Sequence, residues 1–184
     1  MATIRSGSTP VLLVIDAQEG VLAAAHDGDA VLENIRETLG KARERGVPVI
    51  WIQHSDQDLV RGSDAWRLAP GLEAAPGERR IDKHHNSSFE NTGLEAALAE
   101  LGATELVLAG AATNWCVRAT AYGALDRGYD VTLVSDAHTT ETMELEDGTR
   151  IEASTLIEDL NIALTWLDYP GRKNRAVRTG DLGF

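Results

Sequence analysis

The chain has 184 residues, 43% of them hydrophobic, which suits one domain with a sizeable core and is too apolar for a disordered chain. Its 29 acidic and 17 basic residues give a formal charge of −12, so neither nucleic acid nor an anionic membrane surface is an expected partner. The N-terminal segment has no signal-peptide core, and the apolar runs are far shorter than the ~20 residues of a membrane helix. We therefore expect a single cytoplasmic domain over residues 1–184.

Strand and helix patterns alternate along the first half of the chain. Residues 11–15 form a continuous apolar run that is typical of a strand buried on both faces. The spacing of apolar residues predicts a helix over 29–45, and a second strand follows over 47–52. Residues 53–78 carry Gly, Pro and Asp with weak periodicity, which predicts a long functional loop with a turn of helix near 65–68.

The second half continues this alternation and adds a polar, acidic loop. A capping-box pattern, Thr92-Gly-Leu-Glu95, predicts the start of one of its helices. The predicted elements are a strand over 80–83, a helix over 93–101, a strand over 105–109, a helix from 116 to near 128, a strand over 130–135, the loop over 136–148, a helix over 151–167 and an edge strand near 176–178.

This order of elements predicts an α/β fold with a doubly wound, Rossmann-like sheet of about six mostly parallel strands and helices on both faces. We expect the strand order 3-2-1-4-5-6, in which the first and fourth strands are neighbours. Ligands bind such sheets at the carboxyl ends of the strands, where the order reverses. Asp16 and Gln18 then face the Cys116 segment across one crevice, and Lys83 reaches the same rim.

Cys116 is the only cysteine in the chain, so an internal disulfide is excluded. It follows the fourth strand at the predicted first turn of a helix, where the backbone N–H groups favour a thiolate and can hold an oxyanion. Lys83 supplies positive charge, and Asp16 is placed to accept the thiol proton and return it to a leaving nitrogen. A carboxylate with an ordinary pKa is too weak a base for this, so Asp16 must be partly buried or polarised.

Three separated blocks in this order resemble the isochorismatase-like cysteine hydrolase superfamily, which includes the nicotinamidases. The blocks are Val14-Ile-Asp-Ala-Gln18, Lys83 with Ser88-Phe89 downstream, and Gly110-x-x-Thr113-x-x-Cys116-Val117, and the resemblance covers roughly residues 10–168. It implies a catalytic triad of Asp16, Lys83 and Cys116. It also implies a cis peptide bond between Ala111 and Ala112, and an oxyanion hole made by the N–H groups of Ala112 and Cys116.

The implied reaction is attack of the thiol on an amide, lactam or imide carbonyl, which gives a thioester that water hydrolyses. Nicotinamidases carry an Asp-x-His metal motif after the second strand, and here that strand leads into Gln53-His54-Ser55-Asp56. The chain therefore resembles the metal-free branch of the superfamily, and we expect no metal and no cofactor.

Substrate-binding residues are less clearly marked. We expect Gln18 and His54 to hydrogen-bond substrate in the crevice, and Trp66 and Trp115 to wall a pocket for a flat or apolar molecule. A solvated position for Gln18, a structural role for His54 and a subunit interface for the tryptophans remain alternatives. Specificity is expected in the loops 53–78 and 138–149. The second loop holds an acidic run that is either solvated or closes over a cationic substrate of a neighbouring subunit: Glu141, Glu144, Glu146 and Asp147.

Our leading hypothesis is a cofactor-free cysteine hydrolase that cleaves a carbon–nitrogen bond of a small molecule. The resemblance implies a homo-oligomer, either a dimer or a tetramer. The alternative is a redox or ligand-sensing module that uses Cys116 as a reactive thiol without hydrolysis. A flavodoxin-type nucleotide-binding domain is a third reading, disfavoured because neither G-x-G-x-x-G nor a Walker A pattern occurs.

Overall fold

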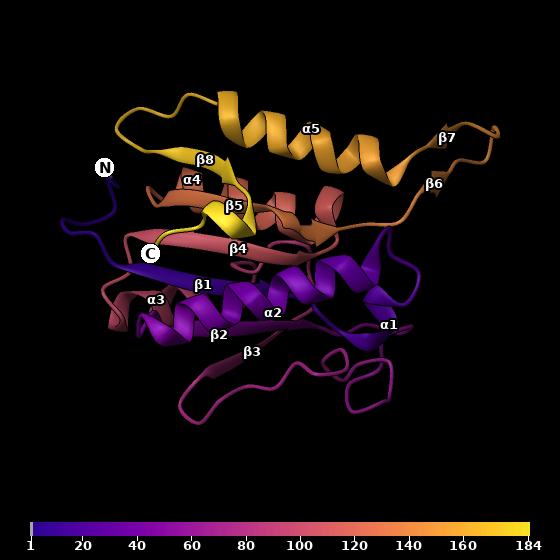
Figure 1. Cartoon of the computed structure of the whole chain (residues 1–184), viewed down its shortest axis with the longest axis horizontal. Helices are drawn as coiled ribbons and strands as arrows, with labels where there is room; N and C mark the ends of the chain where they lie inside the picture. Colours follow the sequence, from indigo (N-terminus) through magenta and orange to yellow (C-terminus); the bar gives the residue numbers. More distant parts are fainter. Residues whose placement is uncertain (1) are drawn as a thin grey trace.

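Six parallel strands form the central sheet, in the order β3-β2-β1-β4-β5-β8 (Figure 1). The computed structural model describes residues 2–184. The predicted α/β class and strand order are confirmed, with β8 as the sixth strand. The strands are β1 (Pro10–Ile15), β2 (Val49–His54), β3 (Arg79–Lys83), β4 (Glu105–Ala111), β5 (Asp130–Thr139) and β8 (Asn174–Val177).

Helices cover both faces of the sheet because alternate strand residues point to opposite sides. Within β1, Leu13 packs in the core shared with α3 (Leu94–Glu100), α4 (Arg118–Asp126) and α5 (Ala153–Trp166). Its neighbour Leu12 packs in the opposite core, with α2 (Gly28–Glu44). A strand buried on both faces needs no polar alternation, which explains the continuous apolar run of β1.

Helix α2 forms where the sequence predicts it. Its buried positions Val31, Ile35 and Leu39 recur every four residues and place one face on the sheet. Gly46 has a φ of +66°, the left-handed conformation that commonly ends a helix and favours glycine.

The structure differs from the prediction around the acidic loop. β5 continues through Thr139 and does not end at residue 135, because its end pairs again with β4 after a register shift. A hairpin of β6 (Met143–Glu144) and β7 (Arg150–Ile151) follows and projects beyond the sheet (Figure 1). Ile151 therefore lies in β7 and not in the last helix.

Two smaller differences lie near the strand ends. Residues 65–68 form turns and a single antiparallel bridge from Leu68 to Gln18 in place of the expected turn of helix. The short helix α1 (Glu19–Leu22), which the sequence did not predict, follows β1 directly. None of the helices described within residues 2–184 has both the length and the apolar character needed to cross a membrane.

Candidate active site

Three polar side chains meet where the strand order reverses between β1 and β4. Asp16 follows β1 with a φ of +46°, an uncommon left-handed conformation for a residue with a side chain. Lys83 is the last residue of β3, and Cys116 follows β4 in a π-helical turn, η1 (Thr113–Val117), that leads into α4. The sheet therefore brings together the three residues that the sequence placed at this edge.

Lys83 forms the centre of this group. Its Nζ lies 2.7 Å from Asp16 Oδ2, 3.2 Å from Cys116 Sγ and 3.2 Å from His54 Nδ1. Lys83 and Asp16 are almost fully buried, and Cys116 is 8% exposed. A buried lysine between a carboxylate and a sulfur is electrostatically favourable because both partners can hold negative charge.

Burial raises the pKa of Asp16, and the ammonium of Lys83 opposes this rise. The sequence requires Asp16 to be partly buried or polarised if it is to act as a base, and Asp16 is buried. Burial, together with the nearby charge of Asp16, also raises the pKa of Cys116 to about 12, although Lys83 acts in the opposite direction. This shift runs against the thiolate expected at a helix start, because desolvation favours the neutral thiol.

The backbone before Cys116 has an unusual path. The peptide bond between Ala111 and Ala112 is cis, as the resemblance implied. The carbonyl of Ala112 accepts hydrogen bonds from the N–H groups of Trp115 and Val117, each 3.1 Å long. These bonds close the turn that carries Cys116. The oxyanion-hole role of the Ala112 and Cys116 N–H groups stays a prediction.

Gly110 allows β4 to pass close to β1 just before this turn. It has a φ of +123°, and a Cβ built at this position lies 1.9 Å from the carbonyl oxygen of Ile15. Only glycine fits such a contact without moving one of the strands. The glycine of the sequence motif thus sets the distance between the strand before Asp16 and the strand before Cys116.

Gln18 uses its side chain to hold the end of β2. Its Oε1 accepts a hydrogen bond from the His54 N–H at 2.8 Å, and its Nε2 donates to the carbonyls of His54 at 3.1 Å and Trp66 at 2.9 Å. The side chain is fully buried, which excludes a solvated position. Its partners favour a positioning role, and the substrate contact expected for Gln18 stays a prediction.

His54 connects the triad with an acidic residue that the sequence analysis did not single out for this role. Its Nε2 lies 3.1 Å from Asp56 Oδ2, while Nδ1 faces Lys83. Since the Lys83 ammonium can only donate, we assign the proton of a neutral His54 to Nε2, where it is donated to Asp56. Asp56 in turn accepts the N–H groups of Asp58 and Leu59, and these bonds lower its pKa.

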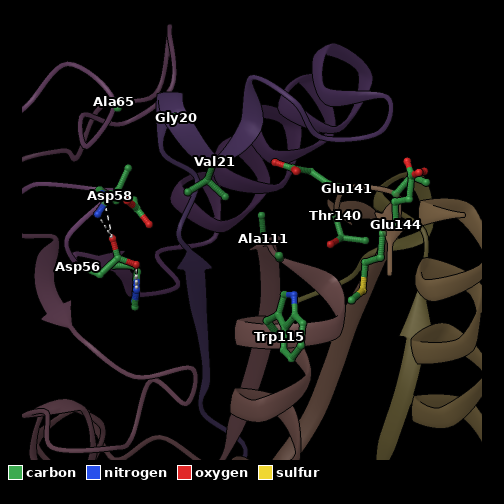
Figure 2. Close-up of a pocket in the computed structure, with 15 residues that line it drawn as sticks. Gly20, Val21, Asp56, Asp58, Ala65, Ala111, Trp115, Thr140, Glu141 and Glu144 are labelled. Atoms are coloured by element: carbon green, nitrogen blue, oxygen red, sulfur yellow. Dashed lines mark hydrogen bonds and ion pairs between the residues drawn. The ribbon is translucent and has the colours of Figure 1, made fainter. Parts of the chain in front are cut away.

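A pocket of about 580 Å³ opens beside the triad (Figure 2). Ala111, Ala112 and His54 line it, and Nδ1 of His54 lies 3.2 Å from Nζ of Lys83 in the triad. Trp115 also lines this pocket and is half exposed, and its contact with substrate stays a prediction. Trp66 lines a separate pocket of about 220 Å³ with Gln53, which does not support its predicted role beside the nucleophile. The other residues that line the larger pocket, the one of about 580 Å³, are Gly20, Val21, Asp56, Asp58, Leu59, Ala65, Thr140, Glu141, Thr142, Met143 and Glu144.

His138 is a positioning residue that sequence reasoning missed. Its ring nitrogens lie 2.8 Å from Thr113 Oγ1 and 3.0 Å from Asn161 Oδ1, so it joins β5 to the Cys116 turn and to α5. Burial lowers the pKa of His138 to about 4, which keeps it neutral at pH 7. The sequence offers little sign of this role, because His138 lies in the segment 136–148 that is predicted to be a loop.

Within the described part of the chain, no group of three or more His, Cys, Asp or Glu side chains is arranged to hold a metal ion.

Comparison with known proteins shows what the chain is similar to. The family model described as the Isochorismatase domain matches residues 10–153. A streptothricin hydrolase from Streptomyces noursei is 36% identical over 135 residues, which cover 70% of this chain but 54% of that protein, so the chain spans about half of its length. The isochorismatase family protein YddQ of Bacillus subtilis (strain 168) is 34% identical over 153 residues, covering 76% of this chain and 82% of that protein.

Among solved structures, an isochorismatase from Pseudomonas putida KT2440 matches with a TM-score of 0.83 at 29% identity, covering 97% of this chain and 94% of that one. Since the family model spans most of the chain and the fold matches that of a solved family member, the chain belongs to the isochorismatase family.

Proposed function

We propose that the protein is a cysteine hydrolase that cleaves a carbon–nitrogen bond of a small molecule, with Cys116 as the nucleophile. One observation carries this proposal: Lys83 Nζ lies within hydrogen-bond distance of both Asp16 Oδ2 and Cys116 Sγ, beside an open pocket. A nucleophile, a base and a cation that orients both are the parts that covalent acyl transfer requires.

The first half of the reaction forms a thioester. Asp16 takes the Cys116 proton as the sulfur attacks the carbonyl carbon, and the carbonyl electron pair moves to oxygen. The N–H groups of Ala112 and Cys116 stabilise this oxyanion. The tetrahedral intermediate collapses, the carbon–nitrogen bond breaks, and Asp16 returns its proton to the leaving nitrogen.

The second half regenerates the thiol. Asp16 removes a proton from water as the water oxygen attacks the thioester carbon, and the carbon–sulfur bond then breaks. The sulfur recovers a proton from Asp16, and the carboxylic acid product leaves. Lys83 stabilises negative charge on Asp16 and on the sulfur in turn, which offsets part of the cost of burying those charges.

The pocket supports a small-molecule substrate. Its volume of about 580 Å³ falls in the range of roughly 300–1,000 Å³ that is usual for such sites. The similarity to a streptothricin hydrolase also favours a small molecule, although it extends over only part of that protein.

The proposal is tested by a hydrolysis screen over amides, lactams, imides and ureas, with release of ammonia or amine as the readout. On the substrate found, Cys116→Ala should lower kcat by at least ~10³-fold, as loss of a nucleophile does in other covalent hydrolases. Mass spectrometry of quenched wild-type reactions should detect the acyl adduct on Cys116. Full activity of Cys116→Ala would falsify the mechanism.

The sensor alternative has less support. Oxidation sensors need a thiolate, and burial raises the pKa of Cys116 to about 12. Reversible sulfenic acid formation at neutral pH, with no turnover of any compound in the screen, would favour that alternative over hydrolysis.

A further inference from the structure

We propose that this pocket selects a cationic substrate: a small amide or lactam that carries an ammonium or guanidinium group remote from the bond that is cleaved. The inference rests on the proposed function, because it assigns a charge to the molecule on which Cys116 acts. It concerns the wall of the pocket and not the triad itself.

Four carboxylates line the pocket, and no lysine or arginine does. Asp56 and Asp58 come from the loop after β2, while Glu141 precedes the hairpin and Glu144 lies in its first strand, β6. Figure 2 shows the two pairs on opposite sides of the opening, with Trp115 below and between them. Negative charge from two separate segments thus faces one hollow, where low-dielectric walls strengthen its field.

These carboxylates are not neutralised by the protein. Within residues 2–184, Asp58, Glu141 and Glu144 form no ion pair, and Asp56 pairs only with the imidazole of His54. The arginines closest to them in sequence are engaged elsewhere, Arg61 with Asp82 and Arg150 with Glu152. A cation in the pocket therefore gains attraction without displacing an existing partner.

Two observations outside the four wall carboxylates bear on how such a ligand lies. The indole of Trp115 is half exposed in the pocket, and an indole face is the best aromatic partner for a cation. Asp16 Oδ1 is buried and has no hydrogen-bond partner within the described chain, although Oδ2 pairs with Lys83, so this carboxylate keeps one acceptor for the proton that the proposed reaction moves. The reacting end of the substrate thus lies toward Asp16, and its charged end toward the acidic walls.

The charge of the pocket is measurable before any substrate is known, because Cys116 is the only cysteine. The probes are three thiol reagents that share one leaving group: aminoethyl, methyl and sulfonatoethyl methanethiosulfonate, which are cationic, neutral and anionic. Each rate of labelling is divided by the rate with free mercaptoethanol. We expect the normalised rate to be at least about tenfold higher for the cationic than for the anionic reagent at low salt, and the ratio to fall as salt is added.

The variant that removes three of the wall charges combines Asp58→Asn, Glu141→Gln and Glu144→Gln. In this variant, the normalised labelling rates of the cationic and anionic reagents should become nearly equal. The matched control combines Glu90→Gln, Glu146→Gln and Glu158→Gln, which removes the same total charge from exposed positions that do not line the pocket. The control should retain most of the ratio, since screening weakens distant surface charges.

A substrate series tests the same inference by turnover. Hexanamide, its ω-amino derivative and the monoamide of adipic acid are of similar length and end in a methyl, an ammonium and a carboxylate group. The ω-amino compound should have the highest kcat/KM and the adipic monoamide the lowest, and the pocket variant should compress this order.

The outcomes separate the two proposals. Equal normalised rates for the cationic and anionic reagents, or a control that loses the preference as fully as the pocket variant does, overturn the cation inference and leave the hydrolase standing. The hydrolase proposal falls on a different result, full activity of Cys116→Ala on a substrate from the screen, so the two failures are distinguishable.

Discussion

At the residue scale, the central feature is that burial disfavours the thiolate of Cys116, the proposed nucleophile. Its thiol has a pKa of about 12, and its companion Asp16 is a stronger base than an exposed aspartate. In the proposed reaction, proton transfer from sulfur to carboxylate is therefore coupled to attack on the carbonyl, when the negative charge passes on to the oxyanion. The pair keeps the thiol protonated at rest, which also protects it from oxidation.

This coupling predicts how activity depends on pH. Asp16 must be ionised to accept the proton, so kcat/KM should rise with pH through the pKa of Asp16, which burial raises above the ordinary 3.8 of an aspartate. Lys83 opposes that rise, so Lys83→Met should move this acid limb to higher pH and lower the plateau. A limb that stays in place in Lys83→Met would remove Lys83 from this role.

At the element scale, the turn that carries Cys116 is held from outside by β5 and α5. His138 joins Thr113 in that turn to Asn161 on α5, and its place at the end of β5 depends on the register shift against β4. The π-helical turn has five residues, too few to hold its geometry alone. Packing and hydrogen bonds to neighbouring elements therefore fix the position of the nucleophile.

The same histidine predicts a stability change below neutral pH. His138 has a pKa of about 4 in the folded chain, against an ordinary 6.5. Between these values the unfolded state binds the additional proton, so the free energy of unfolding should fall as the pH falls, by about 2 kcal/mol between pH 7 and pH 5 from this group. In His138→Gln, which does not titrate, that contribution should disappear. Urea unfolding at the two pH values measures both chains, and an equal loss in the variant would contradict the assignment.

The hairpin shows which elements the sequence does not predict. β6 and β7 have two residues each and lie mostly exposed, so they carry neither an apolar run nor an alternation that marks a strand. The end of β5, Asp136-Ala-His-Thr139, is polar and pairs with β4 only because the tertiary structure offers a partner. By contrast, burial within the fold gives Val11–Ile15 a continuous apolar run and gives α2 apolar residues at helical spacing. Both elements were predicted closely.

At the scale of the whole molecule, topology explains why the triad was predictable and its surroundings were not. Asp16 and Cys116 follow strands and Lys83 ends one, so the strand order alone brings them to one edge. Trp66 sits in a loop whose path depends on hydrogen bonds from Gln18 and Gln53 to its carbonyl, which no local pattern reveals. The pKa of Cys116 likewise depends on burial, a property of the assembled fold.

The C-terminal segment ties the far edge of the sheet to α2. β8 pairs with β5, and the following turn η2 (Thr179–Asp181) is held by Asp136 Oδ1, which accepts the N–H of Thr179 at 2.8 Å and its hydroxyl at 2.7 Å. From α2, Lys41 Nζ donates to the carbonyls of Thr179 at 2.5 Å and Gly180 at 3.2 Å. Leu182 then enters the core beneath α2.

This arrangement makes the C-terminal segment part of the fold and separate from the chemistry. Leu182→Ala removes a buried side chain that is 7% exposed, which should lower the free energy of unfolding by about 2–4 kcal/mol. Because Leu182 contacts neither the triad nor the pocket, kcat/KM of the folded variant should stay near that of the wild type. Urea unfolding and steady-state kinetics on the same preparation separate the two effects. Phe184→Ala is the matched comparison, since this last residue is only partly buried against the same core and should cost less. A Leu182 variant as stable as the wild type would mean that the sheet and α2 hold together without the segment that closes them.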